Sequence, residues 1–130
     1  MADFFEISTL LPALAQRVYQ AWLSSAEHSA MTGGTAQIDP SVGGNFNAWD
    51  GYITGTTLVL EPYRRIVQSW RTIEFPAGAP DSQLEIVLEE HAGETRLTLK
   101  HSNIPAGQGS AYESGWVDNY FDPMKDYFYE

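Results

Sequence analysis

The sequence contains no cysteine among its 130 residues. This absence excludes disulfide bonds, thiolate catalysis and any zinc or iron–sulfur site built on cysteine. Basic residues are also few, because 7 Lys and Arg oppose 17 Asp and Glu and leave a formal net charge of -10. An acidic surface repels the phosphates of nucleic acids and of anionic lipids, so we expect neither nucleic acid nor a membrane among the partners.

Long apolar stretches are missing as well, since no run approaches the roughly 20 residues that a membrane-spanning helix requires. The first residues carry an acid at Asp3 and no basic segment, so we expect no secretory signal and predict a cytoplasmic protein. Apolar residues nevertheless make up 43% of the chain and aromatic residues 13%, which is enough for a sizeable core. At this length we predict a single domain over residues 1–130.

The N-terminal part of the chain predicts one strand followed by one or two short helices. Apolar residues within residues 3–10 favour the strand, and Pro12 suits the start of a helix. Residues 24–31 form a polar corner or a short second helix, which should end at the glycine pair that follows. The predicted core-facing residues of the first helix recur at a spacing of four and are Leu14, Val18 and Trp22.

From residue 35 onward, short alternating segments between turn residues predict an antiparallel meander of about six strands. Asp50-Gly51 is a typical hairpin turn. In the strand that follows it, alternation places Thr56, Leu58 and Leu60 on one face.

The end of the chain returns to helical spacing. A stripe of large apolar residues steps by four from Tyr112 to Phe128, while acidic residues at the same spacing mark a solvated face. Pro123 has no amide hydrogen, so we expect it to kink or restart this helix, with Asp122 as the cap. The element order therefore predicts an α+β fold.

No arrangement of residues in the sequence matches a known catalytic motif or metal site. His28 and His91 lie in the polar corner and beside a turn, where we expect solvated side chains. His101 falls on an apolar strand face, which indicates a hydrogen-bonded histidine at the rim of the core, with a functional role as the alternative. Glu89 and Glu90 are adjacent in a strand and point to opposite faces. We therefore expect no catalytic residue, no metal and no cofactor.

Several large side chains are predicted to converge where the sheet faces the last helix. A curved sheet that closes around a helix often leaves a concave site for a small molecule. Aromatic side chains in that place either pack the core or line a cavity, and the sequence favours neither. The residues predicted to line the cavity are Phe46, Leu58, Gln68, Trp70, Leu99, His101, Trp116 and Tyr120.

An ordered series of short motifs runs through nearly the whole chain. The motifs are Gly43-Gly44-Asn45-Phe46, Asp50-Gly51-Tyr52-Ile53-Thr54-Gly55, Pro62, Arg65-Ile66-Val67-Gln68-Ser69-Trp70-Arg71, Gly93-Glu94-Thr95-Arg96-Leu97, Ile104-Pro105 and Gly115-Trp116. The series resembles the C-terminal-type domain of the activators of the heat-shock protein 90 (Hsp90) ATPase, within the START / Bet v 1-like (SRPBCC) superfamily.

This resemblance implies a helix-grip fold, in which a curved antiparallel sheet of about six or seven strands wraps a long C-terminal helix. One or two short helices should follow the first strand, and many members of the superfamily enclose a cavity for apolar molecules. Eukaryotic activators join this domain to a separate N-terminal domain, for which 130 residues leave no room.

Three functions remain open from the sequence. The leading hypothesis is a non-catalytic domain that binds an apolar or amphipathic small molecule between the sheet and the last helix. The alternative is a co-chaperone or stress-response factor that acts on an Hsp90 homologue. The third is an enzyme of the cyclase/aromatase or hydrolase type, in which His101 or Tyr120 would serve as acid or base. The oligomeric state is left open.

Overall fold

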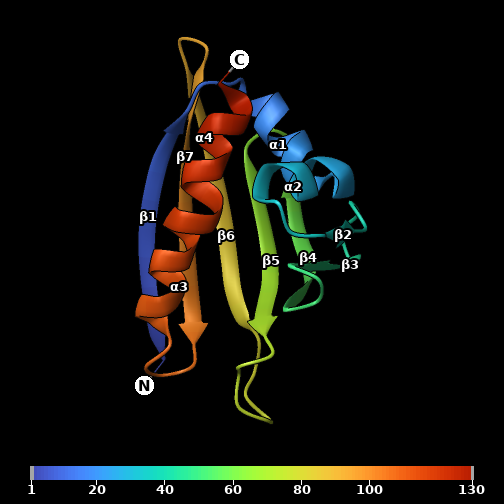
Figure 1. Ribbon diagram of the computed structural model, residues 1–130, viewed down its shortest axis with the longest axis vertical. Coiled ribbons are helices and arrows are strands. Elements are labelled where there is room, and N and C mark those ends of the chain that lie inside the picture. The colour runs from blue at the N-terminus through green and yellow to red at the C-terminus, as the bar shows by residue number, and fades with distance from the viewer. Residues whose placement is uncertain (1, 130) are drawn as a thin grey trace.

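An antiparallel sheet of seven strands curves around the C-terminal helix in the computed structural model, which describes residues 2–129 (Figure 1). Six strands follow one another as a meander, and the first strand closes the far edge by pairing with the last, in the order β1-β7-β6-β5-β4-β3-β2. The predicted helix-grip architecture is confirmed. The strands are β1 (Asp3–Leu11), β2 (Gln37–Ile38), β3 (Asn45–Ala48), β4 (Ile53–Glu61), β5 (Arg65–Thr72), β6 (Ser82–His91) and β7 (Glu94–Ile104).

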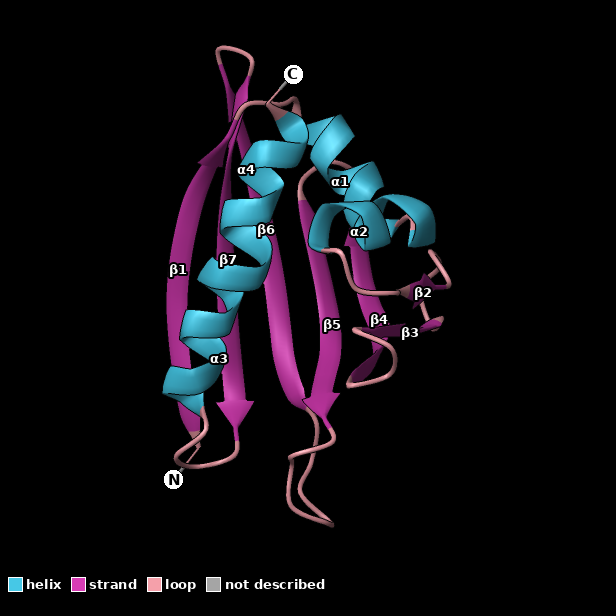
Figure 2. Ribbon diagram, in the orientation of Figure 1, coloured by secondary structure: helices cyan, strands magenta, loops and turns pink. Residues whose placement is uncertain are grey.

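All helices lie on one face of the sheet, as Figure 2 shows. Two short helices follow β1, as predicted, and the second begins where the Ser24 hydroxyl accepts a hydrogen bond from the Glu27 amide at 3.2 Å. It ends at Gly33, whose φ of 84° suits glycine. Within residues 2–129, no helix is long and apolar enough to cross a membrane. The helices are α1 (Ala15–Leu23), α2 (Ser25–Thr32), α3 (Gly109–Trp116), the π-helix η1 (Val117–Phe121) and α4 (Asp122–Phe128).

The C-terminal helix passes through Pro123 by means of a π turn. The amide of Asp122 donates to the carbonyl of Val117, five residues earlier, and the chain continues directly into α4. The predicted interruption therefore takes the form of a π turn. Asp122 is not a cap, contrary to the prediction, because its backbone is helical (φ -65°, ψ -49°) and no new helix end is created.

One residue of the stripe predicted to face the core from α1 does not lie in the core. Leu14 is 52% exposed, because it precedes the helix with an extended backbone and lies outside the helical periodicity. Val18 and Trp22 are buried as predicted. Helix α1 starts at Ala15, one residue after Leu14. The amide of Ala15 donates to the Glu90 carboxylate at 2.8 Å, so this acid at the end of β6 stabilises the N-terminus of α1.

A β-bulge in β4 makes a second prediction wrong, namely that Leu58 and Leu60 share one face of the strand. The pairing of β4 with β5 shifts between Thr57 and Val59, and Thr57 is completely buried. An additional residue on one strand changes the face that the following side chains occupy. Leu58 therefore does not share an inward face with Leu60, and 45% of it is exposed.

Candidate functional site

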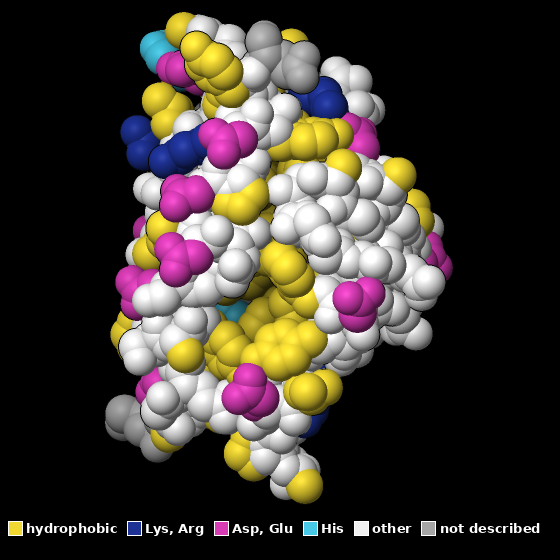
Figure 3. All heavy atoms as spheres, viewed as in Figure 1, with side chains coloured by type: hydrophobic (Ala, Val, Ile, Leu, Met, Phe, Trp, Pro, Cys, Tyr) yellow, Lys and Arg dark blue, Asp and Glu magenta, His cyan; other side chains and the backbone are white. Residues whose placement is uncertain are grey.

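A pocket of about 560 Å³ opens between the C-terminal helix and strands β4 and β5. Hydrophobic side chains gather in a hollow of the surface there (Figure 3). The volume lies within the roughly 300–1,000 Å³ typical of small-molecule sites. Its aromatic lining consists of Trp49, Tyr52, Trp70, Tyr112, Trp116 and Tyr120.

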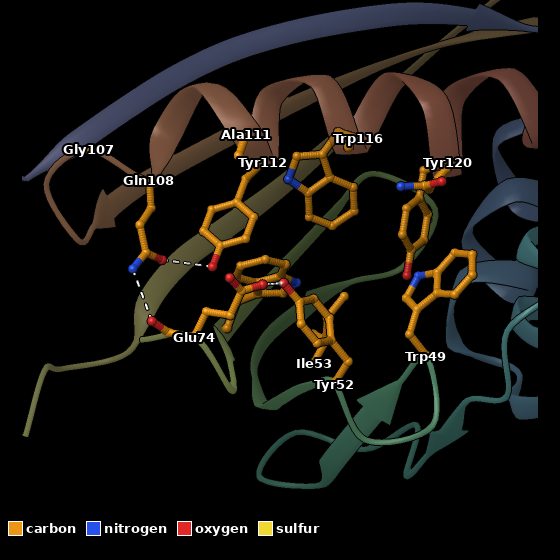
Figure 4. A pocket seen from close by; sticks show the side chains of 13 residues that line it. Trp49, Tyr52, Ile53, Glu74, Gly107, Gln108, Ala111, Tyr112, Trp116 and Tyr120 are labelled. Atoms are coloured by element: carbon orange, nitrogen blue, oxygen red, sulfur yellow. Dashed lines mark hydrogen bonds between the residues drawn. The ribbon is translucent and has the colours of Figure 1, made fainter. Parts of the chain in front are cut away.

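Three of these aromatic residues form the floor of the pocket. Trp70 comes from the inward face of β5, so sheet and helix meet through the three rings. Trp116 and Tyr120 lie one turn apart on the C-terminal helix (Figure 4). Each is at most 4% exposed. The ring centroids of Trp70 and Trp116 are 5.7 Å apart, and those of Trp116 and Tyr120 are 4.7 Å apart. Such distances are typical of aromatic pairs that stabilise one another.

Below this floor the interior is filled. The cavity that remains beneath the rings measures about 10 Å³, which is at the lower limit for a single water molecule. A ligand of drug-like size therefore does not fit beneath the floor, whereas the open pocket on the outer side has room for one.

Trp49 forms a side wall because of an unusual backbone. Its φ is 54°, in the left-handed region, at the turn between β3 and β4. Gly34 provides the space for its ring, since a Cβ at that position would lie 2.4 Å from Trp49 Cε3. The wall thus depends on a glycine that is distant in the sequence.

His101 lies behind the floor with both ring nitrogens engaged. The indole Nε1–H of Trp116 donates to Nδ1 at 3.1 Å, which leaves the proton on Nε2 to be donated to Ser82 Oγ at 2.8 Å. Ser82 in turn donates to the carbonyl of Trp70 at 2.6 Å. Burial lowers the pKa of His101 to about 3, so the ring is neutral and has no free lone pair for a substrate proton.

His28 is buried and not solvated, which contradicts the prediction. It is 5% exposed because α2 packs against the C-terminal helix. Its Nδ1–H donates to the carbonyl of Trp22 and its Nε2 accepts from the Tyr120 hydroxyl, both at 2.9 Å. Burial lowers the pKa of His28 and raises that of Tyr120, so both groups are uncharged at neutral pH. His91 is exposed, as predicted.

Polar groups hold the mouth of the pocket together (Figure 4). The hydroxyl of Tyr52 donates to the Glu74 carboxylate. Gln108 bridges two elements, because its Nε2 donates to the Glu74 carbonyl at 3.0 Å while its Oε1 accepts from the Tyr112 hydroxyl at 2.8 Å. Thr72 completes the chain with a 2.7 Å hydrogen bond to the same hydroxyl. These bonds tie the loop after β5 to the start of the C-terminal helix.

No group of three or more histidine and carboxylate side chains in residues 2–129 is placed to hold a metal ion. The chemistry of the pocket is thus that of an aromatic surface with a few hydrogen-bonding groups and one carboxylate at its mouth.

The model of the Activator of Hsp90 ATPase homolog 1-like protein family matches residues 12–129. The chain belongs to this family. Among curated relatives, it is 28% identical over 127 residues to an uncharacterised protein of Schizosaccharomyces pombe, covering 98% of this chain and 37% of the relative. It is 27% identical over 113 residues to the human activator of 90 kDa heat shock protein ATPase homolog 1, covering 87% and 33%. The chain therefore spans about a third of the length of these relatives.

Solved structures share the fold of this chain. An Hsp90 activator from Plasmodium falciparum superimposes with a TM-score of 0.87 at 22% identity, over 95% of this chain and 94% of that one. CalU16 from Micromonospora echinospora superimposes with a TM-score of 0.82 at 26% identity, over 98% and 77%. These likenesses establish the START / Bet v 1-like fold for this member of the family.

Within this Hsp90-activator-like domain, the residues predicted to line a cavity fall into three groups. Trp70, Trp116 and Tyr120 face the open pocket. Phe46 and Gln68 lie under the floor, where Gln68 accepts a 3.4 Å hydrogen bond from Trp22 Nε1. The three predicted residues that line neither space are Leu99 and His101, which are completely buried, and Leu58, which is exposed.

Most residues at the wall and the mouth of the pocket were not among those predicted from the sequence. Tyr112 belongs to the predicted helical stripe and could have been found from it. Trp49 and Tyr52 flank the predicted Asp50-Gly51 turn, so an aromatic residue on each side of a hairpin turn was the available signal. Glu74 follows β5 in an irregular segment with no pattern that could have marked it.

Proposed function

We propose that this domain, acting in the cytoplasm, binds a small apolar or amphipathic molecule in the aromatic pocket without reacting with it. The observation that carries the proposal is an open pocket of about 560 Å³ with six aromatic side chains on its lining. Burial of apolar ligand surface against such a lining is favourable at roughly 25 cal/mol per Å². The floor is pre-formed by packed rings, so little has to be ordered when a ligand enters.

The state of the candidate acids and bases supports a role without catalysis. A general base needs an accessible lone pair and a pKa near the working pH. His101 Nδ1 already accepts from Trp116, and the Tyr120 hydroxyl already donates to His28. Both side chains are thus committed to holding the floor in place.

Gly115 offers a direct test, because it lines the pocket in the middle of a helix. A Cβ there would meet only Asn119 Nδ2, at 3.8 Å. We expect Gly115→Leu to fill the pocket without loss of stability, since replacing a glycine inside a helix is favourable by up to about 1 kcal/mol. Titration with the neutral fluorescent probe N-phenyl-1-naphthylamine should show saturable binding to the wild type and at least tenfold weaker binding to the variant.

Gly115→Ala is the matched control, because it makes the same helical change with one methyl group and should retain most of the binding. Native mass spectrometry of the gently purified wild type should reveal a bound molecule that is absent from Gly115→Leu. Equal probe binding by the wild type and Gly115→Leu would contradict the proposal, as would a wild type that binds no probe and carries no ligand.

A second candidate function is the stimulation of an Hsp90 homologue, and the names of the relatives support it. We expect a saturating concentration of the domain to raise the ATP hydrolysis rate of the Hsp90 homologue of the same organism. The assay should include Gly115→Leu, because unchanged stimulation by this variant would assign the effect to a surface other than the pocket. An unchanged hydrolysis rate with the wild-type domain would count against this function.

A further inference from the structure

We infer that the pocket selects organic cations, namely molecules with a flat aromatic body and an ammonium or similar cationic end that lies next to Glu74. This inference rests on the proposed binding function of the same pocket and specifies the chemical class of the ligand.

The charges around the pocket favour a cation. Glu74 is the only charged residue on the lining within the described part of the chain, and no lysine or arginine reaches it. The basic residue nearest in sequence, Arg71, is engaged elsewhere, because its Nη1 donates to the Ala79 carbonyl at 3.0 Å and to Asp81 at 2.7 Å. His28 and His101 lie behind the floor, and burial lowers the pKa of each, so neither supplies positive charge at neutral pH.

Glu74 is held in place by the residues around it. Its backbone amide donates to Thr72 Oγ1 at 3.1 Å, and its carbonyl accepts from Gln108 Nε2 at 3.0 Å. The Tyr52 hydroxyl donates to Oε2 of the carboxylate (Figure 4). Burial, followed by this hydrogen bond, raises the pKa of Tyr52 to about 12, so the hydroxyl keeps its proton and the carboxylate keeps a fixed direction. The other oxygen, Oε1, accepts no hydrogen bond from residues 2–129 and can interact with a ligand.

The aromatic walls add a second attraction for positive charge. The face of a tryptophan or tyrosine ring carries partial negative charge and attracts a cation placed over it, most strongly where water is excluded. Trp49, Tyr52 and Tyr112 are half-buried, so parts of their rings remain available to a ligand at the mouth beside Glu74. A carboxylate or sulfonate ligand meets the opposite situation, because it would have to lose water next to Glu74 in a protein of net charge -10.

Three naphthalene probes that differ in the group attached to the same methylene test this inference by isothermal titration calorimetry. They are the cation (2-naphthylmethyl)trimethylammonium, its neutral carbon analogue 2-neopentylnaphthalene and the anion 2-naphthylacetate. We expect the wild type to bind the cation about tenfold more tightly than the neutral analogue, and the anion more weakly than either. Glu74→Gln should reduce the preference for the cation to about threefold or less while leaving the affinity for the neutral analogue unchanged.

Glu94→Gln is the matched control, because it removes one negative charge from the exposed β6–β7 hairpin and should leave all three affinities unchanged. Comparable or tighter binding of the neutral or anionic probe by the wild type overturns the inference but leaves the binding function intact. If Glu94→Gln lowers the preference as much as Glu74→Gln, the assigned role of Glu74 is wrong. Binding of none of the three probes overturns the proposed function itself.

Discussion

Replacing Trp116 with alanine should lower the free energy of unfolding by about 3–5 kcal/mol, as measured by urea denaturation. Trp116 is 3% exposed and its ring packs against those of Trp70 and Tyr120. Its removal takes away this packing and also the only donor to His101 Nδ1 in the described structure. A loss of this size is a large fraction of the stability of a small domain, so the thermal midpoint should fall as well.

The variant Trp116→Phe separates the contribution of ring packing from that of the hydrogen bond to His101. It keeps an aromatic ring in the floor but removes the indole N–H, so His101 Nδ1 is left without its donor. An unsatisfied buried acceptor costs about 1–3 kcal/mol, so we expect Trp116→Phe to lose about that much and less than Trp116→Ala. If Trp116→Ala unfolds at the same urea concentration as the wild type, Trp116 does not carry the floor of the pocket.

The overall fold was predictable because its elements follow simple periodicities. The aromatic stripe of the C-terminal helix, with Trp116 and Tyr120, and the alternation of Leu97, Leu99 and His101 in β7 each gave the correct buried face. These patterns arise because a helix repeats every 3.6 residues and a strand every two. An element buried on one side therefore has apolar residues at that spacing in the sequence.

The predictions failed where the chain departs from regular geometry. The bulge after Thr57 adds one residue to β4, so Leu60 returns to the buried side while Leu58, next to the buried Thr57, stays exposed; the predicted regular alternation of Leu58 with Leu60 does not allow for that extra residue. The burial of His28 depends on the docking of α2 against the C-terminal helix, with Tyr120 as its partner. Such contacts join residues far apart in the sequence, and propensity and periodicity carry no information about them.

The candidate site also combines residues on regular elements, which were predictable, with residues in irregular segments, which were not. Its floor was predictable from Trp70, Trp116 and Tyr120, which lie on regular elements. Its mouth is built from Trp49 at a left-handed backbone position and Glu74 in the loop after β5, where side-chain direction is set by local turns and long-range hydrogen bonds. The regular elements therefore predict the floor of the pocket, whereas the residues at its mouth lie outside the regular patterns.

His101 should make the stability of the domain strongly dependent on pH. Burial lowers its pKa from 6.5 to about 3 in the folded state, while in the unfolded chain it titrates at its ordinary value. Between these values the unfolded state binds one more proton, so stability is fully present above about pH 7 and is lost as the pH falls toward 3. We expect His101 alone to remove on the order of 4–5 kcal/mol over this range, measured by urea denaturation at successive pH values.

The control variant His101→Gln isolates this contribution from that of the carboxylates and of His28. A glutamine can accept from Trp116 with its oxygen and donate to Ser82 with its amide, so it replaces both hydrogen bonds without a titratable group. The neighbouring rings of Phe5 and Trp70 carry no charge, and burial is the cause of the lowered pKa of His101.

Between pH 6 and pH 4, the stability of His101→Gln should fall by about 1.4 kcal/mol less per pH unit than that of the wild type. Equal slopes for the two proteins would mean that His101 takes up a proton within the folded state, which the closed hydrogen-bond chain from Trp116 to the Trp70 carbonyl does not permit.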